Sequence, residues 1–263
     1  METIETVESP KEQSGSEALS KVIFFLNDKG LTHTNNIILP GDVKRLYIER
    51  NKITKFEGLD KFTYLIGLYA KDNYITRIEG LNALSNLRIL DLSKNEIRCI
   101  ENLKSLHTLE TLSLSLNYIG REGIKDVIGL LEVPSIQILD LSKNFIADTN
   151  ILNEVLIKLP NLTILYLQGN RVTGEIENYR KRMIASIRSL KFLDDFPVSE
   201  RDRRLADVYM KEGIEMERIE RFKMNKEMFS EYVNNISNKS EKCSKSLIPA
   251  IKPIGKLAKE YNK

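Results

Sequence analysis

The chain has 263 residues, of which 41% are hydrophobic and 29% charged, and its formal net charge is +3 at pH 7. This balance is typical of globular proteins, and glycine and proline are too scarce for a fibrous or low-complexity protein. The near-neutral charge gives no general reason to expect a nucleic-acid or membrane partner. Two cysteines, Cys99 and Cys243, stand far apart, so neither a disulfide framework nor a zinc site is expected.

The first segment, residues 1–16, is acidic and polar, where a signal peptide would be basic and then apolar. We expect it to be a disordered tail. No stretch approaches the roughly 18 apolar residues of a membrane-spanning helix, so we expect an intracellular protein without membrane insertion. Residues 17–42 are interpreted as an N-terminal cap, made of an amphipathic helix that stops at Gly30 and a degenerate coil around Ile37.

Residues 43–172 repeat one short pattern. Blocks of the form L-x-L-x-x-N-x-I, with some replacements by Ile, Ala or Val, begin at residues 46, 68, 90, 112, 139 and 165. Successive asparagines are 22 residues apart in the first four blocks, and the next two follow after 27 and 26 residues. The blocks therefore resemble leucine-rich repeats, whose period is about 20–29 residues. The repeat asparagines are Asn51, Asn73, Asn95, Asn117, Asn144 and Asn170.

The pattern predicts an α/β fold, a solenoid of about six leucine-rich repeats with a parallel sheet on its concave side. In L-x-L, alternation sends both apolar side chains to one face of a short strand and x to the other. The asparagine amide can satisfy backbone groups that would otherwise be buried without a partner. One repeat cannot bury its own apolar face, but stacked repeats share a continuous core. The segments after Asn117 and Asn144 are long enough for an α-helix of two or three turns on the convex side.

Residues 173–198 are interpreted as a C-terminal cap of the solenoid. The apolar residues of this segment have helical spacing up to Leu190, and Phe192 and Leu193 then lie where the next strand would begin. A solenoid end needs such a cover because it exposes core. We expect structural roles for the cap residues, namely Tyr179, Arg180, Leu193, Asp194 and Pro197.

A different kind of sequence follows. Ser199 and Asp202 have the spacing of a helix capping box, and residues 199–238 predict one long charged amphipathic helix, weakened near its middle by Gly213. Its apolar stripe is interrupted, so we expect the first half to dock on the solenoid and the second half to be either free or bound to a partner. Residues 239–263 are rich in lysine and contain two prolines, which predicts a disordered basic tail.

The outward positions of the repeats form rows on the expected concave face. An open concave sheet is the surface that solenoids commonly use for binding, and tyrosine side chains can serve as anchors there. We interpret the face as a protein-binding surface. The candidate residues are Tyr47, Glu49, Arg50, Tyr69, Lys71, Asp91, Lys94, Asp140, Lys143 and Tyr166.

The cap and the helix behind it resemble the dynein axonemal assembly factor 1 family. The motifs that carry the resemblance are Asn178-Tyr179-Arg180, then LKFLDDFPV over 190–198, and an Asp-Arg element over 202–206 that leads into a charged helix. The resemblance covers roughly residues 18–235. It implies a cytoplasmic factor that acts with chaperone machinery to preassemble axonemal dynein arms, hence a role in the cilium or flagellum with dynein chains and chaperones as partners.

Two other interpretations stay open, a targeting subunit of protein phosphatase 1 and a scaffold like the U2 snRNP A-prime protein, since both classes share the 22-residue repeat. An enzyme is not expected, because no nucleophile–base set, phosphate loop or metal cluster emerges from the sequence. No small-molecule substrate, metal or other cofactor is predicted. A nucleic-acid partner is not expected, and the free protein is predicted to be a monomer.

Overall fold

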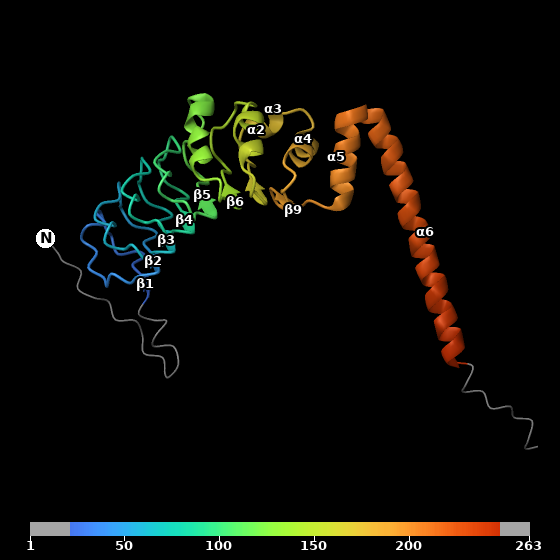
Figure 1. Ribbon diagram of the computed structural model, residues 1–263, viewed down its shortest axis with the longest axis horizontal. Coiled ribbons are helices and arrows are strands. Elements are labelled where there is room, and N and C mark those ends of the chain that lie inside the picture. Colours follow the sequence, from blue (N-terminus) through green and yellow to red (C-terminus); the bar gives the residue numbers. More distant parts are fainter. Residues whose placement is uncertain (1–21, 248–263) are drawn as a thin grey trace, which may run out of the picture. The chain divides into compact units, whose positions relative to one another are not determined.

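The computed structural model describes residues 22–247, and the expected acidic tail over 1–16 lies outside them. The chain divides into two compact units, residues 1–207 and 208–263. The described part of the first unit is a stack of coils whose strands form one sheet in chain order, from β1 to β9 (Figure 1). Its strands are β1 (Ile23–Phe25), β2 (Arg45–Tyr47), β3 (Gly67–Tyr69), β4 (Ile89–Asp91), β5 (Thr111–Ser113), β6 (Ile138–Asp140), β7 (Ile164–Tyr166), β8 (Phe192–Leu193) and β9 (Phe196–Pro197).

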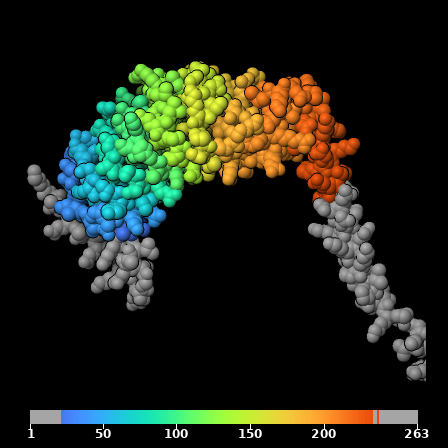
Figure 2. Space-filling model, in the orientation of Figure 1, coloured from blue at the N-terminus to red at the C-terminus, as the bar shows by residue number. Residues whose placement is uncertain are grey.

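The strands are parallel from β1 to β8, and their register follows the repeat, so that Leu46 lies beside Leu68 and Leu68 beside Leu90. These leucines are fully buried. They share one core with the leucines of the convex turns. Each coil packs mainly on its neighbours, and the sequence colours therefore form successive bands on the surface (Figure 2). The predicted leucine-rich-repeat solenoid with a parallel sheet is confirmed.

The convex side contains only short helices. After Asn117 the chain forms two 3₁₀ helices, η1 (Gly123–Asp126) and η2 (Ile128–Glu132), and after Asn144 it forms α2 (Ile151–Glu154) and the 3₁₀ helix η3 (Leu156–Lys158). The predicted α-helices of two or three turns are therefore wrong. A Cβ atom on Gly129 would lie 2.0 Å from the Ile100 carbonyl oxygen, so the backbone is pressed against the preceding coil and follows its shape.

The expected N-terminal helix is also wrong for the described residues, because Ile23–Phe25 forms strand β1. Phe24 pairs in register with Leu46, 22 residues later, and the Leu26 amide donates to the Tyr47 carbonyl oxygen at 2.7 Å. VIFFL is thus an additional degenerate repeat, with Lys29 where the asparagine would stand. The short apolar run fits a strand and a helix equally well, and the available sheet edge decides for the strand.

The C-terminal cap closes the other end of the stack. It contains α3 (Val172–Glu175) and α4 (Tyr179–Ser186), whose Met183 and Ile184 are buried. Leu193 of β8 pairs in parallel with Leu165, as predicted for the next strand. Strand β9 then turns back and pairs antiparallel with β8. This hairpin covers a sheet edge that would otherwise offer unpaired backbone groups.

The extension forms two helices where one was predicted, α5 (Glu200–Glu212) and α6 (Ile214–Leu247). Gly213, between them, has a φ of +85°, a left-handed conformation that ends a helix and that glycine adopts without strain. The capping box is confirmed: the Ser199 hydroxyl accepts from the Asp202 amide, and the Asp202 carboxylate accepts from the Ser199 amide, both at 3.1 Å. Helix α6 ends at Leu247, beyond the expected boundary at 238, and residues 248–263 lie outside the described part.

Candidate functional site

The repeat asparagines form a ladder of hydrogen bonds under the sheet. Asn95 is typical: its side-chain amide donates to the carbonyl oxygens of Ala70 and Leu92, both at 3.0 Å, and its Oδ1 accepts from the Ile75 amide at 3.0 Å. The side chain is 5% exposed, so each bond satisfies a backbone group shielded from water. Asn51, Asn73, Asn117, Asn144 and Asn170 make equivalent bonds. The ladder ties each coil to the preceding one and so keeps the outward rows in register.

The residue before each of these asparagines has a left-handed backbone, with φ between 52° and 78° in the six repeats from Arg50 to Gly169. The sharp turn ends the strand and carries the chain away from the concave face. Three of the predicted binding residues, Arg50, Lys94 and Lys143, occupy this row. They therefore lie at the margin of the sheet and not at its centre.

An aromatic stack covers the N-terminal end of the concave face. The rings of Tyr47 and Tyr69 are 2° from parallel with centroids 4.3 Å apart, and Phe25 stacks on Tyr47 at 4.7 Å. A Cβ atom on Gly67 would lie 3.1 Å from Cε2 of Tyr69, so the absence of a side chain there makes room for the ring. Burial, with the neighbouring Tyr47 second, raises the pKa of the Tyr69 phenol. The two tyrosines are thus held by each other, which lowers the entropy that binding a partner would cost.

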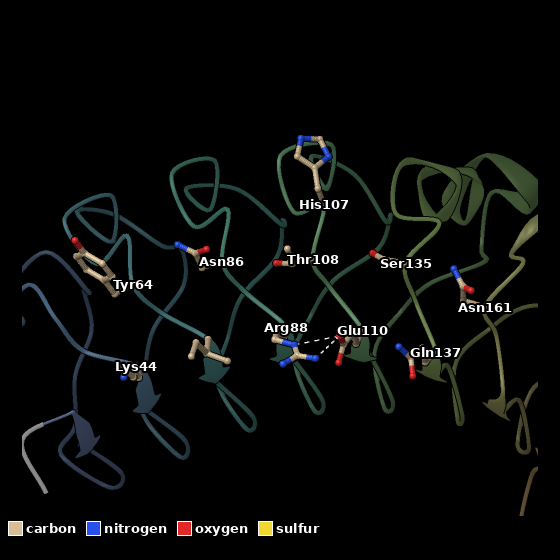
Figure 3. Close-up of a pocket in the computed structure, with 11 residues that line it drawn as sticks. Lys44, Tyr64, Asn86, Arg88, His107, Thr108, Glu110, Ser135, Gln137 and Asn161 are labelled. Atoms are coloured by element: carbon tan, nitrogen blue, oxygen red, sulfur yellow. Dashed lines mark hydrogen bonds and ion pairs between the residues drawn. The ribbon is translucent and has the colours of Figure 1, made fainter. Parts of the chain in front are cut away.

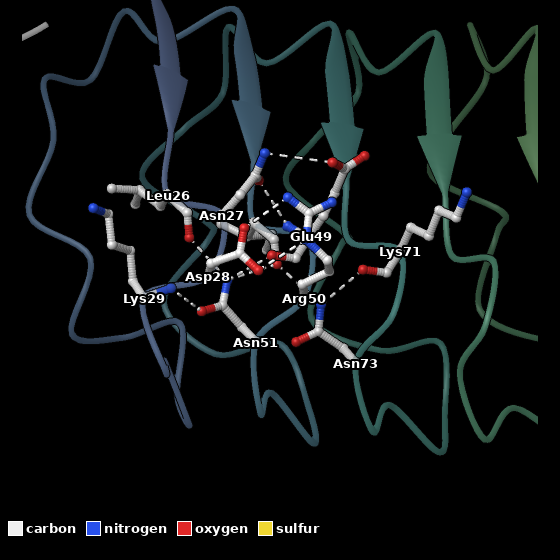
Figure 4. A network of polar contacts seen from close by, with 10 residues as sticks. Leu26, Asn27, Asp28, Lys29, Glu49, Arg50, Asn51, Lys71 and Asn73 are labelled. Atoms are coloured by element: carbon white, nitrogen blue, oxygen red, sulfur yellow. Dashed lines mark hydrogen bonds and ion pairs between the residues drawn. The ribbon is translucent and has the colours of Figure 1, made fainter.

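Cross-repeat pairs hold several of the predicted charged residues (Figure 4). The Arg50 guanidinium donates to both carboxylate oxygens of Asp28, at 2.8 and 2.6 Å, and Asn27 exchanges hydrogen bonds with Glu49. Arg50 and Asp28 are both exposed, so the contribution of this pair to stability is small. In the next repeats, Lys94 lies 3.6 Å from a carboxylate oxygen of Asp72.

The middle of the face is polar. The Asp91 carboxylate accepts from the amide and the hydroxyl of Ser93, and the Asp140 carboxylate accepts from the Ser142 amide at 2.9 Å. The Ser93 hydroxyl also contacts that of Ser113 at 2.7 Å. These carboxylates are engaged in turn-like bonds with residues two positions on, as acidic side chains often are.

Toward its C-terminal end the face becomes apolar. The residue that precedes each inward leucine also points outward, and on β6 and β7 this row contains the half-buried Ile138 and Ile164, which are neighbours in register. Exposed Phe192 continues the row on β8. Our sequence interpretation missed this row because it followed only the x of L-x-L. Simple alternation through the preceding residue would have found it.

Of the predicted charged residues, Lys71 and Lys143 are exposed, and among the described residues neither has an ion-pair partner. Exposed Arg45 of β2, in the row before the inward leucines, also has no ion-pair partner among the described residues, so these three cations remain open to a partner. The concave face therefore combines a preformed aromatic stack, a polar centre, an apolar end and three open cations. Such a mixed surface suits another folded protein or a peptide.

A groove of about 820 Å³ runs along the flank where the chain returns to the strands (Figure 3). Its polar side chains form a second ladder, because Asn86, Thr108 and Asn161 each donate to a carbonyl oxygen of the preceding coil at 2.9 to 3.0 Å. Arg88 and Glu110, which also line the groove, form an ion pair with each other. These groups are occupied by the fold itself, so the concave face is the stronger candidate.

The predicted cap residues join the cap segments to one another. Arg180 donates to the carbonyl oxygens of Leu193 and Pro197 at 3.3 and 2.8 Å. The Asp194 carboxylate accepts from the amides of Leu167 and Gln168, at 2.8 and 3.0 Å. Burial, followed by the Asp194 charge, strongly raises the pKa of Tyr179.

Comparison with known proteins gives one family. The family model described as "Leucine-rich repeat" matches residues 67–220. A leucine-rich-repeat-containing protein named ODA7, from Chlamydomonas reinhardtii, is 39% identical over 104 residues, which are 40% of this chain and 24% of that protein. A dynein axonemal assembly factor 1 homologue from Drosophila pseudoobscura is 41% identical over 91 residues, 35% of this chain and 6% of its own. In Peromyscus polionotus, dynein axonemal assembly factor 1 is 40% identical over 96 residues, 36% of this chain and 15% of its own.

The chain thus spans less than a quarter of the length of these relatives. Among solved structures, the Drosophila melanogaster SNF/U2A' complex contains a chain that is 31% identical, with a TM-score of 0.47 and coverage of 53% of this chain and 79% of that one. An internalin from Listeria monocytogenes is 27% identical, with a TM-score of 0.48 and coverage of 60% and 42%.

Proposed function

Because the chain belongs to the leucine-rich-repeat family, we propose that it is a protein-binding scaffold that acts in the assembly of axonemal dynein. The observation that carries the proposal is the concave face, whose stacked Tyr47 and Tyr69 form a preordered surface. The relatives that are about 40% identical over the repeats, and that are named dynein axonemal assembly factors, support dynein as the assembly concerned.

The proposal places the protein in the cytoplasm of cells that build motile cilia or flagella, where it would bind a dynein chain or a chaperone during preassembly. Among the described residues, no helix is long and apolar enough to cross a bilayer. Lys71 and Lys143, with the apolar row near Tyr166, would supply the contacts of the concave face. The aromatic stack would supply a rigid anchor at its other end.

Catalysis is not part of the proposal. Burial, followed by the charge of Asp126, raises the pKa of the Cys99 thiol, which disfavours the reactive thiolate. Within residues 22–247 the structure brings together no group of His, Cys, Asp and Glu side chains that could hold a metal ion. The phosphatase-targeting and U2-like alternatives remain predictions without an observation that favours them.

The experiment that tests the proposal is deletion of the gene in a flagellated source organism, followed by electron microscopy of the axonemes. We expect dynein arms to be missing and beating to stop, and a tagged full-length copy to restore both. Intact arms in the deletion strain would refute a role in dynein assembly. The deletion does not test whether the concave face is the binding surface, which requires variants of that face.

A further inference from the structure

An exposed cluster of three apolar side chains and one arginine lies at the margin of the concave face, where the chain leaves strands β5 and β6. It consists of Leu116, Tyr118, Arg121 and Phe145, here called the flank patch. Its three apolar side chains are 41%, 38% and 46% exposed. Tyr118 and Phe145 each directly follow a ladder asparagine, so they come after the turn that ends the concave rows. The rings are neighbours because the repeats are stacked in register.

Arg121 is held against both rings of the flank patch. The centre of its guanidinium lies 4.9 Å from the ring centroid of Tyr118 and 4.2 Å from that of Phe145. The two rings are 15° from parallel with centroids 5.8 Å apart. Among the described residues Arg121 has no hydrogen-bonded or ion-paired partner. The stack therefore fixes the plane of the guanidinium and leaves its N–H donors available for a planar acceptor such as a carboxylate.

The charges beside the flank patch favour an acidic ligand. A hollow of about 410 Å³ adjoins it, lined by Arg98, Cys99, Arg121, Glu122, Lys125 and Asp126. The acidic groups of this hollow are engaged, because Glu122 pairs with Lys125 at 2.5 Å and the Asp126 carboxylate accepts from the amides of Gly120 and Glu122. The exposed guanidinium groups of Arg98 and Arg121 are then the charged groups of the hollow that are not paired, so the hollow favours a negatively charged ligand.

Leu116 is unusual within its row. Its φ is +57°, a region that costs energy for any residue with a Cβ atom, and the equivalent positions are occupied by aspartate, arginine, lysine or glycine, so Leu116 is the apolar exception. With 41% of its surface exposed, this leucine is not needed to fill the core. It widens the apolar surface beside Tyr118.

We infer that the flank patch and the adjoining hollow bind a short acidic and apolar peptide segment of a partner protein. Its apolar side chains would pack on Leu116, Tyr118 and Phe145, and a carboxylate would pair with Arg121. A nucleic acid fits less well, because the ring faces are covered by each other and by Arg121, and the carboxylates of Glu122 and Asp126 line the hollow. The rings and Arg121 come after the turn that ends the concave rows, and the inference needs no dynein partner, so it does not depend on the proposed function.

The test is selection of a random peptide library, displayed on phage, on the full-length protein, with counter-selection on a Tyr118→Ser/Phe145→Ser variant. We expect enriched peptides that combine Asp or Glu with large apolar residues. Synthetic copies should bind the wild type and bind the double variant and Arg121→Gln at least about tenfold more weakly. Unchanged thermal unfolding of the variants would exclude misfolding as the cause.

Tyr74→Ser supplies the matched control. Tyr74 follows a ladder asparagine two repeats earlier and is 52% exposed, and among the described residues no ring or cation stacks on it. It should leave peptide binding unchanged, as should the concave-face variant Tyr166→Ala. No enrichment over the double variant, enriched peptides without acidic residues, equal loss in Tyr74→Ser, or binding of only a single-stranded oligonucleotide would each overturn the inference.

Discussion

The phenol rings of Tyr47 and Tyr69 lie 4.3 Å apart and 2° from parallel on the concave face of the sheet. The two residues are 22 positions apart in sequence and pair in register on adjacent strands. A repeat of constant length thus converts two separate tyrosines into one rigid surface. Gly67, beside Tyr69 on the same strand, leaves the space that the ring occupies.

This arrangement predicts opposite effects for two glycine substitutions. In Gly67→Ala the new Cβ would lie 3.1 Å from Tyr69 Cε2; the ring would have to shift by a few tenths of an ångström against Tyr47, and we expect a loss of about 1 kcal/mol in the free energy of unfolding. In Gly174→Ala, within helix α3, the Cβ meets nothing within 4 Å, and we expect a gain of about 0.5–1 kcal/mol. Urea unfolding of the two variants measures both changes. Equal effects of the same sign would contradict the packing described for Tyr69.

The asparagine ladder predicts a large cost for one buried side chain. Asn95→Ala removes two N–H donors, which are shared among three carbonyl oxygens, and one acceptor in a site that is 5% exposed. Because the backbone partners stay buried without replacement, we expect the free energy of unfolding to fall by about 3 kcal/mol or more. Asn86→Ala is the control, since this exposed residue donates a single bond to the Thr63 carbonyl oxygen; it should cost under about 1 kcal/mol. A similar cost at both positions would show that the ladder is not what holds the coils together.

The left-handed backbone of Leu116 predicts that a different residue is more stable there. Asparagine tolerates this conformation, and Leu116 is partly exposed. We therefore expect Leu116→Asn to raise the free energy of unfolding by about 0.5–1 kcal/mol, net of the apolar contacts that are lost. The same variant should weaken any peptide bound at the flank patch. A destabilised variant would mean that the leucine is retained for packing.

Acid should loosen the junction between the cap and helix α5. Burial alone would raise the pKa of Asp202, but hydrogen bonds from Ser199 and the charge of Arg180 lower it below the ordinary value of 3.8. A lowered folded-state pKa means that the stabilisation is fully present above the unfolded value and is lost as the pH falls below it, through the folded value. Melting temperatures of the wild type and Asp202→Asn, measured from pH 6 down to pH 2, should converge in acid. A difference between the two melting temperatures that stays constant from pH 6 to pH 2 would contradict a stabilising role of the ionised Asp202 carboxylate.

The repeat period made most of the fold predictable. Six asparagines in register predict the parallel strands and the inward leucines, because both depend on spacing alone. VIFFL was misread, since five apolar residues cannot distinguish a period of 2 from one of 3.6 and Lys29 hides the missing asparagine. The length of the helices after Asn117 and Asn144 was overestimated for another reason. Close contact with the preceding coil, as at Gly129, determines the conformation of these segments.

The candidate site was predictable only in part. Tyr47, Tyr69, Lys71 and Tyr166 are found on the expected face, because alternation places them there. The ion pairs between repeats were not predicted, although Arg50 and Asp28 are one repeat period apart and this spacing places them side by side. The position of Arg121 over two rings depends on an irregular turn in a longer repeat, and no periodic rule specifies such a turn.

The central claim, that the concave face binds a component of dynein assembly, is tested most directly by quantitative co-precipitation of axonemal dynein chains from a flagellated cell. The bait is the full-length protein, compared with Lys71→Glu/Lys143→Glu/Tyr166→Ala and with the control Lys104→Glu, an exposed lysine on a convex turn. The account predicts that the triple variant, folded as judged by its thermal unfolding, recovers at least about tenfold less of the dynein chains, while the control recovers the wild-type amount. Equal recovery by the triple variant and the wild type would contradict it.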